Sequence, residues 1–156
     1  GNKLATSTMT FDKITTIPIK VVFCSSEENK AEDTPASNLV DGKPNTFWHT
    51  MYSVTMANFP HTVDFDCYLS KTLTGFSYLP RQDSPNGNIR EYEIQVSEDG
   101  KNWSEVICKG SFEKNNLLKK VKFDKPVKAR YLRFRALSSH DGHDYATGAE
   151  FNIMAE

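Results

Sequence analysis

The sequence lacks an excess of either charge and lacks long apolar runs. Among its 156 residues, Lys and Arg number 19 against 20 Asp and Glu, which gives a formal net charge of −1. A protein that binds nucleic acid usually carries a basic excess or a basic stripe, so this balance argues against that class of partner. No apolar run approaches the roughly 18 residues that can span a bilayer, so we expect no transmembrane segment. The length fits one domain with a sizeable core.

Cysteine is scarce, and its pattern excludes two common uses. Cys24, Cys67 and Cys108 cannot all pair within the chain, and no Cys-x-x-Cys spacing suggests a zinc site. Each lies in a stretch that predicts a strand, so we expect free thiols packed as small hydrophobic groups. One disulfide with one free thiol is the alternative. The sequence also lacks a signal peptide and begins with Gly1 rather than Met, so we interpret it as an excised module.

Helical periodicity is nearly absent, and a period of two dominates. In residues 62–67, the apolar side chains Val63, Phe65 and Cys67 alternate with polar ones. Such alternation predicts strands with one buried face and one solvated face. The same pattern recurs over residues 91–97 and 130–136, and further strands are predicted over residues 17–23, 75–79, 103–109 and 118–123.

Turn residues separate these predicted strands. Asp99-Gly100 predicts a tight hairpin, and Asn86-Gly87 predicts a turn on a longer loop. Pro126 is expected to end one strand before the next begins at Arg130.

Only one segment has the features of a helix. Thr34 can cap it, Pro35 suits its first position and Gly42 suits its end, which predicts one or two turns from Thr34 to Val40. The fold prediction is therefore an all-β antiparallel sandwich of about eight strands with one short helical turn. Residues 1–14 are expected to form a loose leader and residues 15–156 the domain.

Four segments resemble, in order and spacing, the signature of discoidin domains, which are also called coagulation factor 5/8 type C domains. They are ASNLVDGKPNTFWHT at 36–50, YLPR at 78–81, SEDGKNW at 97–103, and ARYLRFRA at 129–136 with AEF at 149–151. The resemblance covers Ile17 to Met154 and implies a galactose-binding-domain-like jelly roll. Animal members usually close their ends with a disulfide, and no Cys lies near this C-terminus. The sequence therefore looks closer to the family 32 carbohydrate-binding modules of bacterial glycosidases and sialidases.

This resemblance implies a non-catalytic module that binds terminal galactose-type sugars of a glycan. The matching positions fall on loops or strand ends and are Glu32, His49, Tyr52, Arg81, Asn86 and Tyr145. Carboxylate, guanidinium, imidazole and amide groups suit sugar hydroxyls, and an aromatic ring suits the flatter apolar face of galactose. Tyr52 departs from the Trp that is frequent among galactose binders. Glu32 lies in an acidic run, residues 27–33, of a kind that is usually solvated.

The resemblance also implies a structural calcium ion between the loop at Asp41 and the last strand. The matching positions are Asn38, Asp41, Lys43, Thr46, Ala149 and Glu150. Two carboxylates with backbone carbonyls form a hard oxygen set that suits calcium and not zinc. The simpler alternative is that Asp41 is a turn residue and Glu150 an edge charge.

Catalysis and adhesion are the alternatives to sugar binding. The run HDGHD at 140–144 could bind a metal or share a proton, but no nucleophile motif accompanies it, so we expect a solvated loop and no enzyme. The alternative function is protein adhesion or phospholipid binding. The mildly apolar stretch 51–59 carries no Lys or Arg, so we do not expect a membrane partner. We expect a monomeric module of a larger glycoside-processing or surface protein, located outside a bacterial cell or on its surface.

Overall fold

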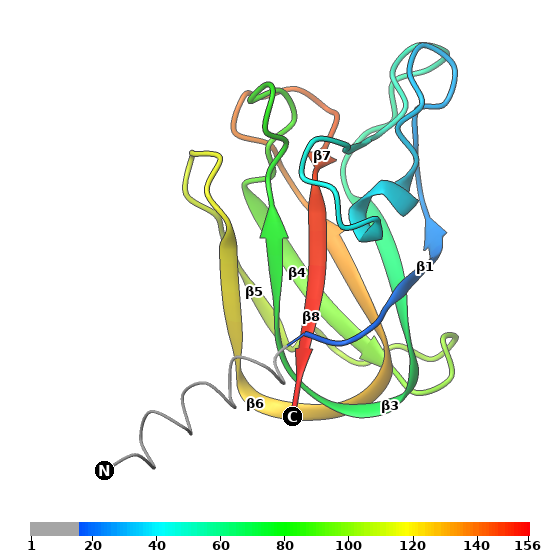
Figure 1. Cartoon of the computed structure of the whole chain (residues 1–156), viewed down its shortest axis with the longest axis vertical. Coiled ribbons are helices and arrows are strands. Elements are labelled where there is room, and N and C mark those ends of the chain that lie inside the picture. Colours follow the sequence, from blue (N-terminus) through cyan, green and yellow to red (C-terminus); the bar gives the residue numbers. More distant parts are fainter. Residues whose placement is uncertain (1–15) are drawn as a thin grey trace.

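The computed structural model describes residues 16–156, and the leader expected over residues 1–14 lies outside them. The described part forms a β-sandwich with one short 3-10 helix (Figure 1). Its elements are β1 Lys20–Cys24, η1 Ala36–Val40, β2 Trp48–His49, β3 His61–Leu79, β4 Glu91–Ser97, β5 Cys108–Ser111, β6 Lys119–Ala136, β7 Thr147–Gly148 and β8 Glu150–Ala155. The all-β prediction with a single helical turn is confirmed. Within residues 16–156, no helix has the length and apolar character needed to cross a bilayer.

Two long antiparallel strands, β3 and β6, bend and contribute to both layers of the sandwich. Their register runs from His61 opposite Ala136 to Asp66 opposite Tyr131, is interrupted, and resumes at Lys71. The first part of β3 also pairs with β1, and the second part pairs with β8. One layer is therefore β1-β3-β6-β4-β5, and the other is β6-β3-β8. The bend lies at the lower end of the molecule in Figure 1, beside the C-terminus.

The sequence divided each of these long strands into two, and this was wrong. Residues 62–67 and 75–79 belong to β3, while residues 119–123 and 130–136 belong to β6 and Leu118 lies just before it. Pro126 does not end a strand, because it is exposed and lies in the stretch between Lys122 and Val127 that has no partner in β3. Its missing N–H therefore removes no ladder hydrogen bond.

Two other predicted elements are shorter than expected. Only the end of the stretch 103–109 is strand, since β5 begins at Cys108. Before it, the amide of Val96 donates to the hydroxyl of Ser104, and the amide of Ser104 donates to the carbonyl of Val96, in place of a regular ladder. The helical segment is one 3-10 element. Thr34 does not cap it, since its hydroxyl donates instead to the carbonyl of Glu28, and Pro35 occupies the N-cap. Gly42, with φ of +74°, follows the helix as predicted.

Aromatic rings fill the space between the layers. Phe151 stacks on Phe65 with ring centroids 4.4 Å apart and on Phe76 at 5.3 Å. Trp48 is buried, as predicted, and its indole N–H donates to the carbonyl of Ser26 at 2.9 Å. Cys67 is buried in this core while the other two cysteines are half-buried, and all three are free thiols. The core fixes the strand ends from which the upper loops extend (Figure 1).

Candidate functional site

The predicted sugar-binding residues lie around His49, at the end of the sandwich opposite the C-terminus. His49 ends β2, which pairs with β7 and so places His49 opposite Thr147. Its side chain is buried, and its Nδ1 lies 2.6 Å from the carbonyl oxygen of Thr50. A carbonyl only accepts, so Nδ1 carries the proton and Nε2 of the neutral ring is free to accept. Burial lowers the pKa of His49 and favours this neutral form.

Aromatic rings flank His49 on both sides. The ring centroid of Tyr52 lies 4.5 Å away and that of Tyr145 lies 4.8 Å away. His143 continues the row by stacking on Tyr145 at 4.7 Å with an interplanar angle of 15°. The row joins the β2–β3 loop to the β6–β7 loop. Sequence reasoning missed His143, which it assigned to a solvated loop.

Glu32 is fixed by Tyr52. The hydroxyl of Tyr52 donates to Oε2 of Glu32 at 2.7 Å, and this bond is the main cause that raises the pKa of Tyr52 to about 12. The other oxygen of Glu32, Oε1, accepts no hydrogen bond from any side chain or amide of residues 16–156. Oε1 of Glu32 can therefore accept a hydrogen bond from a ligand hydroxyl, while the bond from Tyr52 holds the carboxylate in position.

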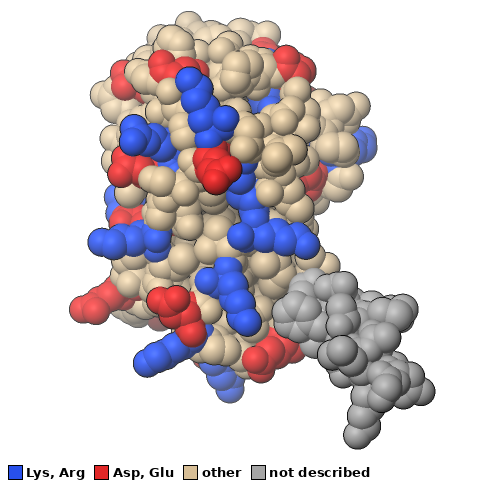
Figure 2. Space-filling view, turned by 90° about the vertical axis from the view of Figure 1, so that its left-hand side faces the viewer, with Lys and Arg blue, Asp and Glu red and all other residues tan. Residues whose placement is uncertain are grey.

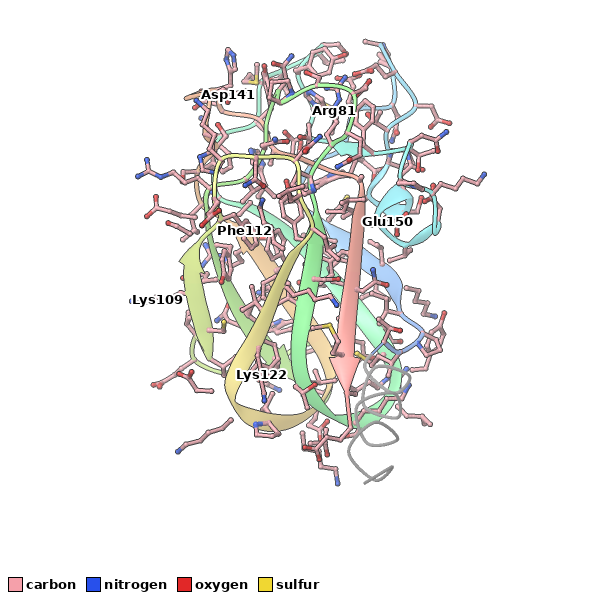
Figure 3. All side chains as sticks on the ribbon, turned by 60° about the vertical axis from the view of Figure 1, so that its left-hand side comes forward. Arg81, Lys109, Phe112, Lys122, Asp141 and Glu150 are labelled. Carbon is pink, nitrogen blue, oxygen red and sulfur yellow. The ribbon has the colours of Figure 1, made fainter. Side chains whose placement is uncertain are left out.

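Arg81 is held between an aromatic ring and a carboxylate. Its guanidinium carbon lies 3.9 Å from the ring centroid of Phe47, and Nε donates to Asp83 at 2.6 Å. Nη2 also reaches Asp83, at 3.4 Å, whereas Nη1 has no partner within the described part of the chain. Phe47 lies two residues before His49, so this contact places Arg81 beside the cluster. Figure 3 shows it on a loop at the upper end of the molecule.

Asn86 lies at the edge of this cluster. Its carbonyl oxygen accepts from the hydroxyl of Thr147 at 2.7 Å, and its side chain is exposed. The next residue, Gly87, approaches Tyr145 so closely that an added Cβ would lie 3.0 Å from the ring. The structure thus groups Glu32, His49, Tyr52, Arg81 and Tyr145 and puts Asn86 beside them.

Glu28 organises the loops and was missed by sequence reasoning. It is fully buried, and its carboxylate accepts from the amides of Tyr52 and Ser53 at 3.0 and 2.8 Å and from those of Lys30 and Ala31, both at 2.9 Å. These bonds hold the pKa of Glu28 well below its usual range. Glu28 therefore fixes Tyr52 in place, yet nothing in the acidic run distinguishes it from its neighbours.

Asp141 links two loops of the site. Its carboxylate accepts from the amide of Gly87 at 2.9 Å, from the hydroxyl of Ser139 at 2.8 Å and from the amide of His143 at 3.1 Å. Figure 3 shows Asp141 at the same end as Arg81. These bonds hold the run at 140–144 against the loop that carries Gly87. Across residues 16–156, no group of three or more His, Cys, Asp or Glu side chains is placed to hold a metal ion.

The predicted calcium positions form a second cluster, beside η1 and the start of β8 (Figure 3). The carboxylate of Asp41 accepts from the hydroxyl of Thr46 and, at 2.8 Å, from the amide of Lys43. The carbonyl of Lys43 also accepts from the hydroxyl of Thr46 at 3.2 Å. The side-chain amide of Asn38 donates to the carbonyl of Phe47 at 2.9 Å, and the backbone carbonyl of Asn38 accepts from the amide of Asp41 at 3.5 Å.

The carboxyl group of Glu150 lies beside the carboxylate of Asp41 in this cluster. Burial and the neighbouring carboxylate of Asp41 raise the pKa of Glu150 to about 8. Its Oε1 is buried and has no hydrogen-bond partner among the described residues. Two carboxylates, a hydroxyl and backbone carbonyls, including that of the buried Ala149, are the hard oxygen donors that calcium prefers. The residues present therefore fit the ion that the sequence predicts.

The sequence signature extends over most of the chain. Residues 22–151 match the family described as "F5/8 type C domain". The chain belongs to the F5/8 type C domain family. This F5/8 type C domain is 36% identical over 158 residues to a sialidase of Micromonospora viridifaciens, a match that includes 100% of this chain and 24% of the relative. It is 35% identical over 135 residues to a galactose oxidase of Gibberella zeae, with 85% of this chain and 19% of the relative covered.

Solved structures of family 32 modules share the fold. The Clostridium perfringens module CpGH89CBM32-5, in complex with GalNAc-β-1,3-galactose, is 35% identical with a TM-score of 0.79, covering 88% of this chain and 95% of that one. The family 32 module of C. perfringens NanJ, in complex with galactose, is 30% identical with a TM-score of 0.78, covering 90% and 98%. The resemblance to family 32 modules is confirmed. The chain spans about a quarter or less of its curated relatives, so it corresponds to one module of such proteins.

Proposed function

We propose that this domain is a non-catalytic carbohydrate-binding module for terminal galactose-type sugars, galactose or N-acetylgalactosamine. The sugar-binding residues are Glu32, His49, Tyr52, Arg81, Asn86 and Tyr145. The observation that carries the proposal is the buried His49, whose Nε2 is left to accept between two tyrosine rings and within the field of Arg81.

The chemistry of the cluster suits a pyranose with an axial hydroxyl. Nε2 of His49 and Oε1 of Glu32 accept hydroxyl protons, and Nη1 of Arg81 donates to a hydroxyl oxygen. A tyrosine ring covers the apolar C–H face, which the axial 4-hydroxyl of galactose leaves flat. An epimer puts that hydroxyl elsewhere and leaves buried polar groups unpaired, so discrimination follows.

The relatives support the choice of ligand. Two similar modules were solved with galactose and with a disaccharide of N-acetylgalactosamine and galactose. The curated relatives are larger enzymes, among them a sialidase and a galactose oxidase. We infer that the domain directs a larger glycoside-processing or surface protein to glycans, outside a bacterial cell or on its surface. An isolated shallow site binds near the millimolar level, about −4 kcal/mol, and multivalent attachment raises avidity.

A structural calcium ion is the second part of the proposal. The carboxylates of Asp41 and Glu150 would hold it together with the carbonyls of Asn38, Lys43 and Ala149 and the oxygens of Thr46. The ion would neutralise two adjacent carboxylates and tie the loop after η1 to β8. The raised pKa of Glu150 and its unpaired Oε1 support this assignment.

Adhesion to a protein or phospholipid is the alternative, and one observation favours it. Val54 and Met56 in the β2–β3 loop are 63% and 44% exposed. That loop lacks the basic rim that anionic membranes require, and sedimentation with liposomes tests the alternative directly.

The proposal is tested by NMR titration of ¹⁵N-labelled protein with galactose, glucose and N-acetylglucosamine in the presence of calcium. We expect shifts for galactose only, centred on the amides around His49, and their loss in His49→Ala. Tyr52→Phe should weaken binding, because it removes the bond that holds Glu32, whereas Tyr131→Phe is a matched control outside the cluster. If the three sugars produce the same response, or His49→Ala leaves the galactose shifts intact, the proposal is wrong.

A further inference from the structure

A surface hollow has Arg81 in its wall. It measures about 370 Å³ and separates the β3–β4 loop from the β5–β6 loop. Its walls are formed by Arg81, Gln82, Asp83, Ser84, Pro85, Asn88, Lys114, Asn115 and Asn116. None of the tyrosines around His49 contributes to it, and Arg81 is the one predicted sugar-binding residue in its wall. Its volume lies within the roughly 300–1,000 Å³ that is typical of small-ligand sites.

The walls of the hollow combine amide side chains with a larger exposed apolar area. Gln82, Asn88, Asn115 and Asn116 each carry an amide that can both donate and accept, and Ser84 adds a hydroxyl. The charge of Arg81 is largely met by Asp83, which leaves Lys114 as the other charged group of the wall. This chemistry fits an uncharged ligand rich in hydroxyl or acetamido groups.

One amide of the wall has no partner. Asn88 is 6% exposed, and its Oδ1 makes no hydrogen bond with any of residues 16–156. A buried acceptor without a partner is costly, so a ligand that supplies a donor gains from meeting it. Rotation of the amide exchanges Oδ1 and Nδ2, so this side chain can offer either group to the hollow.

The walls are braced against each other before any ligand binds. Nε2 of Gln82 donates across the hollow to the carbonyl of Asn116 at 3.0 Å and to that of Pro80 at 2.7 Å. Asn115 accepts from the amide of Leu117 at 3.0 Å and from the ammonium group of Lys119. The side chains of Lys114 and Asn116 make no hydrogen bond within the described part and are exposed. They can therefore turn to a ligand without breaking the walls.

We propose that this hollow is a second saccharide subsite, which takes the uncharged sugar linked to the one bound at His49. The hollow adjoins the His49 cluster, because Asn88 in its wall is bridged to Thr147, which lies opposite His49, and because Arg81 also lines it. The proposal rests on the proposed function and extends it, since it makes the ligand a disaccharide or longer glycan rather than a single galactose.

Calorimetric titration with galactose, lactose and GalNAc-β-1,3-galactose tests the subsite on the whole chain. We expect at least one disaccharide to bind about tenfold more tightly than galactose. Asn88→Ala and Asn116→Ala should abolish most of that gain and leave the affinity for galactose unchanged. Asn116 is exposed, so its variant stays informative if Asn88→Ala impairs folding. Lys114→Ala should reduce the gain, with Lys109→Ala as a matched control on β5.

The outcomes separate the two proposals. If galactose binds and is lost in His49→Ala, but neither disaccharide binds more tightly or the gain survives in both Asn variants, the subsite is wrong and the proposed function stands. If none of the three sugars binds, both are wrong.

Discussion

The hydroxyl of Tyr78 connects the core to the site, and its removal should lower both stability and galactose affinity. Tyr78 lies near the end of β3 and is 1% exposed. Its hydroxyl donates to the carbonyl of Thr147 at 2.7 Å and accepts from the amide of Ile89 at 3.3 Å. Thr147 lies opposite His49 in the β2–β7 pair. Tyr78→Phe keeps the ring and removes only the atom that joins these two segments.

The magnitude follows from the two groups left unpaired. A buried donor or acceptor without a partner costs about 1–3 kcal/mol, so we expect the two unpaired groups to lower the free energy of unfolding by about 2–6 kcal/mol. For a domain of this length, about 1 kcal/mol corresponds to roughly 2–4 °C, so Tm should fall by at least roughly 4 °C and at most roughly 24 °C. Because Thr147 pairs with His49, galactose affinity should fall as well.

Denaturant and thermal unfolding measure this loss. Tyr131→Phe is the matched control, because Tyr131 is half-buried and its hydroxyl has no hydrogen-bond partner within residues 16–156. We expect that variant to stay within about 0.5 kcal/mol of the wild type. Equal stability of the two variants would show that the Tyr78 hydroxyl does not join these segments.

Three further predictions concern the site and the calcium cluster. Burial lowers the pKa of His49 below its ordinary value of 6.5, so stability from its neutral form is present above pH 6.5 and is lost as the pH falls through the lowered pKa. Galactose affinity should fall together with protonation of the His49 ring, both followed by NMR, and an affinity that is unchanged once the ring is protonated contradicts the role of Nε2. Removal of calcium with a chelator should lower the Tm of the wild type by roughly 5–10 °C relative to its Tm in calcium at a concentration 100-fold above Kd. The Tm of Glu150→Gln, measured by scanning calorimetry, should depend little on calcium. Glu28→Gln should weaken galactose binding although Glu28 does not touch the sugar, because one carboxylate oxygen becomes an NH2 group that cannot accept from the pair of loop amides it faces, and unchanged affinity by titration would refute this.

Much of the local structure could be predicted from the sequence. Alternation over residues 91–97 matches β4 residue for residue, because one face of that strand is buried and the other is solvated. The glycines that follow Asp41, Asn86 and Asp99 all have φ near +75°, since a tight turn there requires a residue without a Cβ. Five of the six predicted sugar-binding residues lie in one cluster, because the loops and strand ends that carry them meet at the same end of the sandwich.

The tertiary structure alone decided where strands continue and which polar groups are buried. Pro126 is tolerated within β6 because the bend leaves residues 123–126 without partners in β3, which depends on residues about 50 positions earlier. Glu28 and Glu32 are alike in sequence, yet only Glu28 is fully buried, where it meets four backbone amides from two loops. Local patterns reflect a residue's preference for backbone shape and for water. Burial and partnership arise only when distant segments pack together, so the sequence predicted the strands and the cluster, and the fold determined the hollow beside Arg81 and the role of Glu28.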